Sequence, residues 1–191
     1  MEDLNICLEN TQRLKLLLES VNTPEDLLLD ILELLESTDF YIAPASTKYH
    51  GACPGGLFNH SMAVAELLIE WGKKGLICWG HDWSPAVIGL LHDFTKVGKY
   101  TLIKIDYTVR PLECDYEYNT DALTYGGHGS DSCIKLLQKI RLTEEETLCI
   151  RYHMGAYEKE DWNGFEKAIA QYETVLWTHH ADMVASKVLG V

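Results

Sequence analysis

Histidine and aspartate residues recur along the chain in a pattern suited to binding metal ions. The candidate ligands are four imidazoles and two carboxylates, in the order His60, His92, Asp93, His128, His153 and Asp182. The central doublet lies in the run Leu90-Leu91-His92-Asp93-Phe94-Thr95-Lys96, where the two adjacent ligands follow hydrophobic residues and precede a lysine. Six such ligands can hold two divalent cations and leave positions open for water and substrate. The pattern favours a metal-dependent enzyme and points to hydrolysis of a phosphate ester.

Each candidate taken alone has a more ordinary interpretation. His60 could cap a helix or lie on the surface, His128 is flanked by glycines as a turn residue would be, and His153 could stabilise a helix C-terminus. Asp182 is less easily explained, because it lies within the apolar segment 179–185, where an unpaired carboxylate is costly. The joint occurrence of these residues in separate segments is what favours a metal site.

The elements that must position these residues are mostly helical. Apolar spacing and end signals predict helices over residues 4–21, 24–37, 57–74, 84 to beyond 93, 130–140, 143–153 and 172–188. Segments 40–56, 126–130 and 155–165 are expected to be loops. Residues 100–125 are rich in Tyr, Thr, Val and Ile and predict a β-hairpin, with Asp106 and residues 113–119 as turn material. The predicted fold class is therefore mostly α, a helical bundle with a small β-hairpin insertion.

Five motifs in this order resemble the HD-domain metal-dependent phosphohydrolase superfamily, over residues 48–187. The motifs are Gly55-Gly56-Leu57-Phe58-Asn59-His60-Ser61, Leu90-Leu91-His92-Asp93 through Lys96, Gly127-His128-Gly129, Arg151-Tyr152-His153-Met154-Gly155 and His179-His180-Ala181-Asp182-Met183. The resemblance implies an all-helical fold with His60, His92, Asp93 and Asp182 as the core metal site. It also implies that His128 and His153 belong to a second metal, with Asp93 between the two. The chain is similar to small HD proteins of bacteria and phages.

The resemblance also implies a mechanism in which a metal-activated water attacks phosphorus in line with the leaving oxygen. Lys96 and Arg151 would stabilise the equatorial oxygens. His179, three residues before Asp182 and so on the same helix face, would orient the substrate or protonate the leaving group. The ligand set leaves the two cations open among Mn, Fe, Mg, Ni and Co.

Three other functions share these residues. An HD-fold di-iron oxygenase similar to myo-inositol oxygenase uses the same six ligands. A mononuclear 5′-nucleotidase would need His60, His92, Asp93 and Asp182 alone. A metal-containing nucleotide-binding module without turnover would keep the ligands without the reaction. The HD-GYP signature beyond the ligands is absent, which argues against a cyclic dinucleotide as the substrate.

Composition limits the partners. The 191 residues, 47% of them hydrophobic, predict one domain over 1–191, with an N-terminal helical extension (1–37) and a metal-binding core (48–188). The net charge of −13 disfavours extended nucleic acid and leaves a small phosphorylated substrate, such as a nucleotide, as the expected partner. No signal-peptide pattern or membrane-spanning stretch is present, so we expect a cytoplasmic protein with no membrane partner, and an oligomer stays open.

Cysteine and aromatic residues give weaker indications. The six cysteines are scattered without a C-x-x-C pair, so we expect reduced thiols rather than a zinc ribbon. Four aromatic residues near the expected site could stack on a base or sugar, although packing is the more ordinary role: Tyr100, Tyr125, Tyr157 and Trp162.

Overall fold

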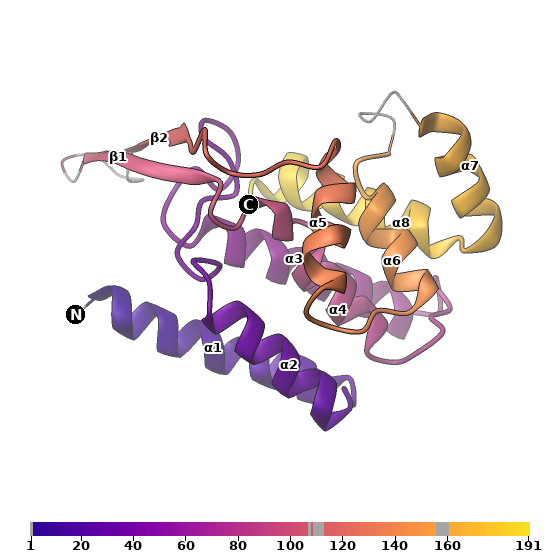
Figure 1. The fold of residues 1–191 in the computed structure, drawn as a ribbon. Coiled ribbons are helices and arrows are strands. Elements are labelled where there is room, and N and C mark those ends of the chain that lie inside the picture. Colours follow the sequence, from indigo (N-terminus) through magenta and orange to yellow (C-terminus); the bar gives the residue numbers. More distant parts are fainter. Residues whose placement is uncertain (1, 107, 109–112, 156–160) are drawn as a thin grey trace.

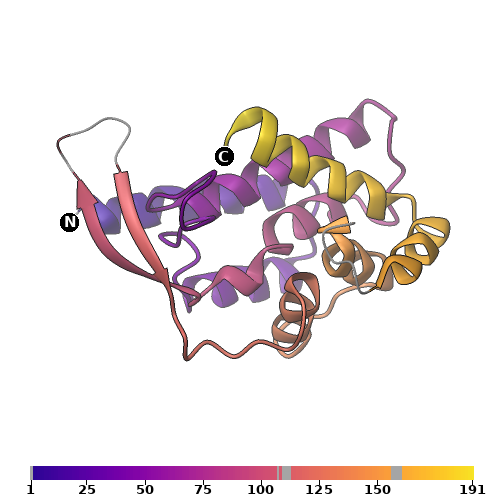
Figure 2. The ribbon, with the colours of Figure 1, turned by 90° about the horizontal axis from the view of Figure 1, so that it is seen from above.

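The computed structural model describes residues 2–106, 108, 113–155 and 161–191. Its helices are α1 (Glu2–Ser20), α2 (Glu25–Glu36), α3 (Gly56–Lys73), α4 (Ser84–Leu91), α5 (His128–Leu137), α6 (Glu144–Tyr152), α7 (Trp162–Gln171) and α8 (Thr174–Val184). Two strands, β1 (Tyr100–Asp106) and β2 (Glu113–Tyr118), form an antiparallel hairpin that projects from the helices (Figures 1 and 2). The predicted fold class, mostly α with a small β-hairpin, is confirmed.

Helices α3 and α4 pack against each other at the centre of the molecule, and every residue of α4 is buried. Their contact is close because α4 has a glycine where it meets α3: a Cβ on Gly89 would lie 2.3 Å from the Cα of Ala65. Helix α3 is apolar on two faces. Phe58 and Met62 join one hydrophobic cluster, whereas Val64 and Leu68 join the other. The pair α3–α4 therefore forms the frame on which both halves of the core are built.

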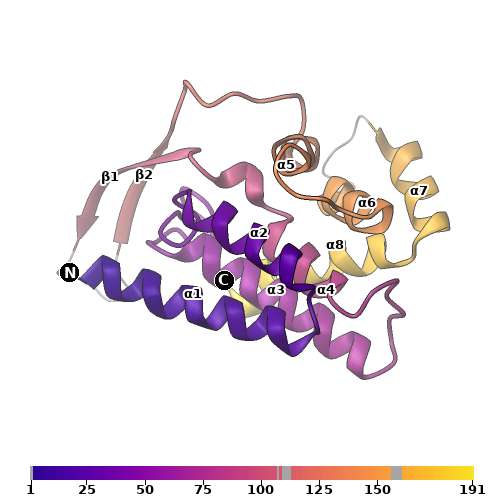
Figure 3. The same cartoon turned by 60° about the horizontal axis from the view of Figure 1, so that its bottom comes forward.

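Helices α1 and α2 cover one side of this frame (Figure 3). Their buried residues include Leu14, Leu18, Ile31 and Leu35, which are part of the same hydrophobic cluster as Phe58. The other side is covered by α6, α7 and α8, and α8 packs on both α3 and α6. Among the described helices, none has both the length and the apolar character needed to cross a bilayer.

Several predicted boundaries are wrong. Helix α4 ends at Leu91 instead of carrying the His92–Asp93 doublet, which occupies the turn before a short 3₁₀ helix, Phe94–Lys96. Helix α5 begins at His128, which we had placed in a loop. The last predicted helix, 172–188, is instead close to the helical span observed, which is α8 followed by a π-helical turn, Ala185–Leu189.

Two segments were assigned the wrong structure. Residues 113–118, predicted as turn material, form β2 and pair with β1 from Asp106↔Glu113 to Tyr100↔Tyr118. The acidic pattern of this segment is compatible with a strand because the hairpin is largely exposed. Residues 162–165, predicted as part of a loop, begin α7, where the Asp161 carboxylate accepts a hydrogen bond from the backbone N–H of Gly164. Residues 156–160 of that predicted loop lie outside the described residues.

Candidate metal centre

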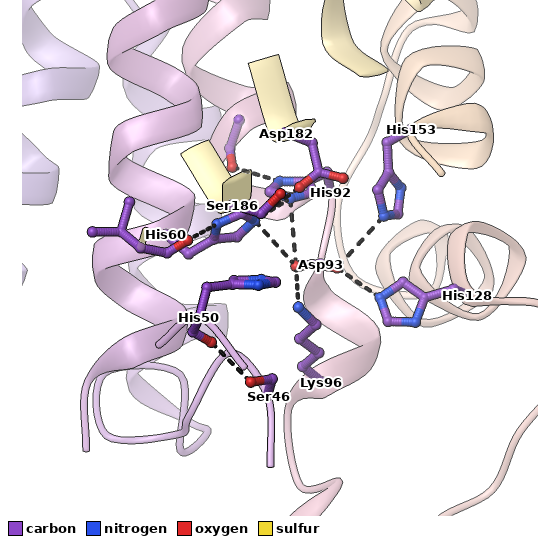
Figure 4. A network of polar contacts seen from close by, with 12 residues as sticks. Ser46, His50, His60, His92, Asp93, Lys96, His128, His153, Asp182 and Ser186 are labelled. Atoms are coloured by element: carbon purple, nitrogen blue, oxygen red, sulfur yellow. Dashed lines mark hydrogen bonds and ion pairs between the residues drawn. The ribbon is translucent and has the colours of Figure 1, made fainter. Parts of the chain in front are cut away.

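The six predicted ligands come together in one place, although they belong to five different segments (Figure 4). His60 is on the first turns of α3, the doublet follows α4, and His128 is the first residue of α5. His153 directly follows α6, and Asp182 is on α8. Three of the imidazoles are completely buried: His60, His92 and His153.

The carboxylate of Asp93 lies at the centre of the cluster and divides the histidines into two pairs. Its Oδ2 is 3.5 Å from Nε2 of both His60 and His92. Its Oδ1 is 2.6 Å from Nε2 of His128 and 3.5 Å from Nε2 of His153. The Asp182 carboxylate approaches the first pair, with Oδ1 3.2 Å from Nε2 of His60. The arrangement thus has two halves that share one carboxylate.

Main-chain carbonyls fix the orientation of the three buried imidazoles. Each Nδ1 donates a hydrogen bond to a carbonyl oxygen: His60 to Val191 (3.0 Å), His92 to Gly89 (2.9 Å) and His153 to Ile150 (2.7 Å). Because a carbonyl can only accept, the proton of each neutral ring is on Nδ1, and Nε2 keeps its lone pair. This outer hydrogen bond to a ligating histidine is a recurrent feature of protein metal sites.

The inner nitrogens fit a cation. Nε2 of His60 and Nε2 of His92 are 3.2 Å apart, and in the neutral rings two lone pairs face each other unless a cation lies between them. Nε2 of His153 is buried without a hydrogen-bond partner among the described residues. A buried polar atom with no partner is costly, and a divalent cation would satisfy it. The buried cluster of histidine and aspartate side chains can therefore hold a metal ion.

The charge balance of the centre depends on Asp93. Burial alone would raise the pKa of Asp93, but the ammonium of Lys96 and the surrounding imidazoles outweigh it and hold the pKa well below 3.8. Asp182 behaves in the same way, because its interactions with His60 and His92 outweigh burial and lower its pKa. Both carboxylates are therefore ionised at neutral pH, as metal ligands must be.

The imidazoles differ in their affinity for protons. Burial lowers the pKa of His92 and His128 despite the nearby carboxylate. Burial also acts to lower the pKa of His153, but the negative charge of Asp93, whose Oδ1 is 3.5 Å from Nε2, outweighs it and raises the pKa above 6.5. His153 is thus the imidazole from which a metal ion would have to displace a proton.

A cavity of about 270 Å³ opens next to the cluster and is lined by Asp93, His128 and Asp182 together with Lys96, His179 and Tyr100. Its size suits a small ligand. Of the other aromatic candidates, Tyr125 is exposed and Trp162 donates its Nε1–H to Glu166. Tyr157 lies outside the described residues.

The three residues proposed to act on a substrate are placed differently. Lys96 is buried, and its Nζ forms an ion pair with Oδ2 of Asp93 at 2.6 Å. His179 lines the cavity, and its Nδ1 donates to the carbonyl of His153 at 2.7 Å. Arg151 instead pairs with Asp161 at 3.5 Å and, as far as the described residues define it, the cavity wall does not include this guanidinium.

A cavity histidine was missed by the sequence analysis. His50 lines the cavity, and the centroid of its ring is 5.2 Å from that of His60. Burial, and then the neighbouring His60 and Lys96, lower the pKa of His50 to about 4, so the ring is neutral at pH 7. One feature of the sequence could have identified this residue. His50 precedes Gly51, in a segment whose glycines allow the backbone to pack closely against a neighbouring element.

Comparison of the chain with protein-family models, with curated proteins and with solved structures gave no match. The site is therefore described by its own geometry. That geometry is a buried set of imidazoles and carboxylates, with a small cavity beside it, that can hold a metal ion.

Proposed function

We propose that the protein is a metal-dependent phosphohydrolase of the HD type that hydrolyses a phosphate ester of a nucleotide or a related small substrate. The observation that carries the proposal is the position of Asp93, whose two carboxylate oxygens face two different pairs of imidazoles. A carboxylate shared in this way is suited to two cations, with Asp182 adding a ligand to the first. The order of the ligands along the chain and the helical fold agree with the HD resemblance.

Two divalent cations at such a site would neutralise phosphoryl charge and lower the pKa of a water molecule. The protein supplies the remaining groups. Lys96 has three donors, of which the contact with Asp93 occupies one, so the ammonium can also donate to a phosphoryl oxygen in the cavity. His179 is held at Nδ1 by the His153 carbonyl, and its Nε2 is the atom that can exchange a proton with a substrate oxygen.

Arg151 contributes to this proposal only if it moves. In the structure its guanidinium pairs with Asp161 and lies 5.1 Å from the ring centroid of Tyr152. To stabilise an equatorial oxygen, Arg151 would have to exchange Asp161 for the substrate. We therefore assign charge stabilisation first to Lys96.

The cavity and the charge distribution support a small anionic substrate. A volume of about 270 Å³ is close to the lower end of the range of small-molecule sites. The net charge of −13 opposes extended nucleic acid, whereas Lys96 and Lys187 place positive charge at the cavity itself.

The test combines metal analysis with a hydrolysis screen of phosphomonoesters and phosphodiesters in Mn and Mg. We expect about two metal ions per chain and turnover of a phosphate ester. His92→Ala should lose both the metal and the activity, whereas His180→Ala should keep both. His180 is a matched control because it is exposed and follows His179 on the same helix.

The other outcomes select the alternatives. Two irons with oxygen consumption and no hydrolysis would replace the proposal with the di-iron oxygenase. Full activity in His128→Ala and His153→Ala would indicate a mononuclear nucleotidase. Tight nucleotide binding without turnover would indicate a binding module, and failure to bind any metal would remove the basis of the proposal.

A further inference from the structure

His50 is held in place by the loop that precedes α3. Its carbonyl accepts a hydrogen bond from the Ser46 hydroxyl at 2.8 Å, and the same Ser46 oxygen accepts one from the backbone N–H of Tyr49 at 2.8 Å. On the other side of His50, the carbonyl of Gly51 accepts from the backbone N–H of Ala45 at 2.9 Å. The backbone is thus fixed on both sides of His50, which is how residues that contact a ligand are commonly supported.

Two glycines allow this loop to pack closely against the start of α3. Gly51 has a φ of +59°, a conformation that a residue with a side chain rarely adopts. A Cβ on Gly56, the first residue of α3, would lie 1.9 Å from the carbonyl oxygen of Gly51. Since His60 follows Gly56 by about one helical turn, this contact brings the His50 ring beside the first predicted ligand.

The His50 ring lies beside the metal-ligand cluster rather than within it. Its nitrogens belong to none of the groups of ligand atoms that converge within 4.8 Å in the described part of the chain. The ring nevertheless lines the cavity and points towards Asp93 and Lys96 (Figure 4). This is the position of a group that contacts what the metal centre binds.

The hydrogen bonding of the ring indicates which nitrogen faces a ligand. Nδ1 of His50 is buried and has no hydrogen-bond partner among the residues that the structure describes. A buried N–H without an acceptor is rarer than a buried acceptor without a donor, so the proton belongs on Nε2. Nε2–H is then a neutral donor available to the cavity.

We propose that His50 is a catalytic residue that donates a hydrogen bond from Nε2 to a phosphoryl oxygen of the substrate. The inference rests on the proposed phosphohydrolase function and adds a residue to it. Lys96 and His50 both line the cavity, and together they provide a charged and a neutral donor for one phosphoryl group. A fixed donor of this kind stabilises the charge that develops on the equatorial oxygens.

Three substitutions separate this role from a structural one. His50→Gln carries an amide N–H near the position of Nε2, His50→Asn carries one near the position of Nδ1, and His50→Ala carries none. If Nε2 is the functional atom, His50→Ala and His50→Asn should each lower kcat by roughly 10²-fold, the effect of losing one oxyanion donor. His50→Gln should retain kcat within about tenfold of the wild type. Metal content should be unchanged in all three.

A second measurement does not depend on turnover. Inorganic phosphate is titrated into the Mg- or Mn-loaded protein, and its dissociation constant is measured by calorimetry. We expect about tenfold weaker phosphate binding in His50→Ala and His50→Asn, and a change within about threefold in His50→Gln, because a hydrogen bond to a charged group is lost only in the first two.

The results that would overturn the proposal are distinct from those that overturn the hydrolase function. Unchanged phosphate affinity and kcat in His50→Ala, absence of phosphate binding by the metal-loaded wild type, or loss of metal in all three variants would each refute the role of His50. If His50→Ala fails to fold, the Gln and Asn variants decide the matter. If the wild type hydrolyses no phosphate ester but binds phosphate in a His50-dependent way, the hydrolase function fails and the His50 contact stands.

Discussion

Replacing Asp93 with asparagine removes the charge at the centre of the site while keeping the shape of the side chain. In the structure the ammonium of Lys96 is 2.6 Å from Oδ2 of Asp93, and both side chains are at most one-tenth exposed. At this separation and an effective dielectric constant of about 20, the attraction is about 6 kcal/mol. Part of this attraction is offset by the cost of burying both charges.

The expected loss of stability follows from what Asp93→Asn leaves behind. The ammonium of Lys96 remains buried without its counter-charge, and breaking one side of a buried ion pair costs about 3–5 kcal/mol. Lys96→Met in the Asp93→Asn background removes the orphaned charge and should recover part of the loss. Glu19→Gln is the control: it breaks the exposed Lys15–Glu19 pair, at 3.8 Å, and should cost less than about 1 kcal/mol.

The assay is urea unfolding in EDTA, followed by circular dichroism, with the free energy taken from the midpoint and slope. The pH dependence provides a second readout. Because folding lowers the pKa of Asp93, this carboxylate stabilises the protein above its ordinary value of 3.8, and the contribution is lost as the pH falls through the lower folded value. Asp93→Asn should therefore show a shallower loss of stability in acid. A loss no larger than that of Glu19→Gln would refute the reasoning.

Three further predictions concern the frame and the ionisation of buried groups. Metal binding should release protons near pH 7, because the neighbouring carboxylate outweighs burial and raises the pKa of His153 above 6.5. Calorimetry in buffers of different ionisation enthalpy measures the number of protons released. Metal binding without proton release would contradict the prediction. Gly89→Ala should destabilise the protein by about 1–3 kcal/mol or more and lower its metal content, because the added Cβ would lie 2.3 Å from the Cα of Ala65. An unchanged midpoint of urea unfolding would argue against this close contact. Burial raises the pKa of Cys149 to about 12, against an ordinary 9.0, so at pH 8 its thiolate fraction is about 10⁻⁴ instead of about 10⁻¹. Iodoacetamide should therefore label the exposed Cys78 and leave Cys149 unmodified. Equal labelling of the two cysteines by mass spectrometry would contradict this.

The sequence predicted those elements whose signals are local. The capping box at Thr143 and Glu146 is present, with the Thr143 hydroxyl oxygen accepting from the Glu146 backbone N–H and the Glu146 carboxylate accepting from that of Thr143. The end of α4 had no such signal, because its residues are uniformly apolar and the turn at His92 and Asp93 is fixed by what surrounds it. Helix α7 was missed because Trp162-Asn163-Gly164 resembles turn sequence, although Asp161 caps the helix.

The ligand types were also predictable, whereas their neighbours were not. Histidine and aspartate chemistry and the order along the chain identified six side chains that the structure brings together. The partner of Arg151 and the position of His50 depend on contacts that no periodicity contains. His50 in particular reaches the cavity through the close approach of Gly51 to Gly56.

The orientation of the imidazoles shows why Lys96 matters before any metal is bound. Because main-chain carbonyls fix Nδ1 of His60 and His92, their Nε2 atoms are directed at one another and at Oδ2 of Asp93. This arrangement brings lone pairs close together, and the ammonium of Lys96 offsets the negative charge of Asp93. If His60, His92 and Asp93 hold a cation, Lys96 would compete with it for Oδ2 of Asp93, and the ion pair between Lys96 and Asp93 would weaken. Metal binding would then release donors of Lys96 towards the cavity, so occupation of the centre and readiness for an anionic substrate would be coupled through this one side chain.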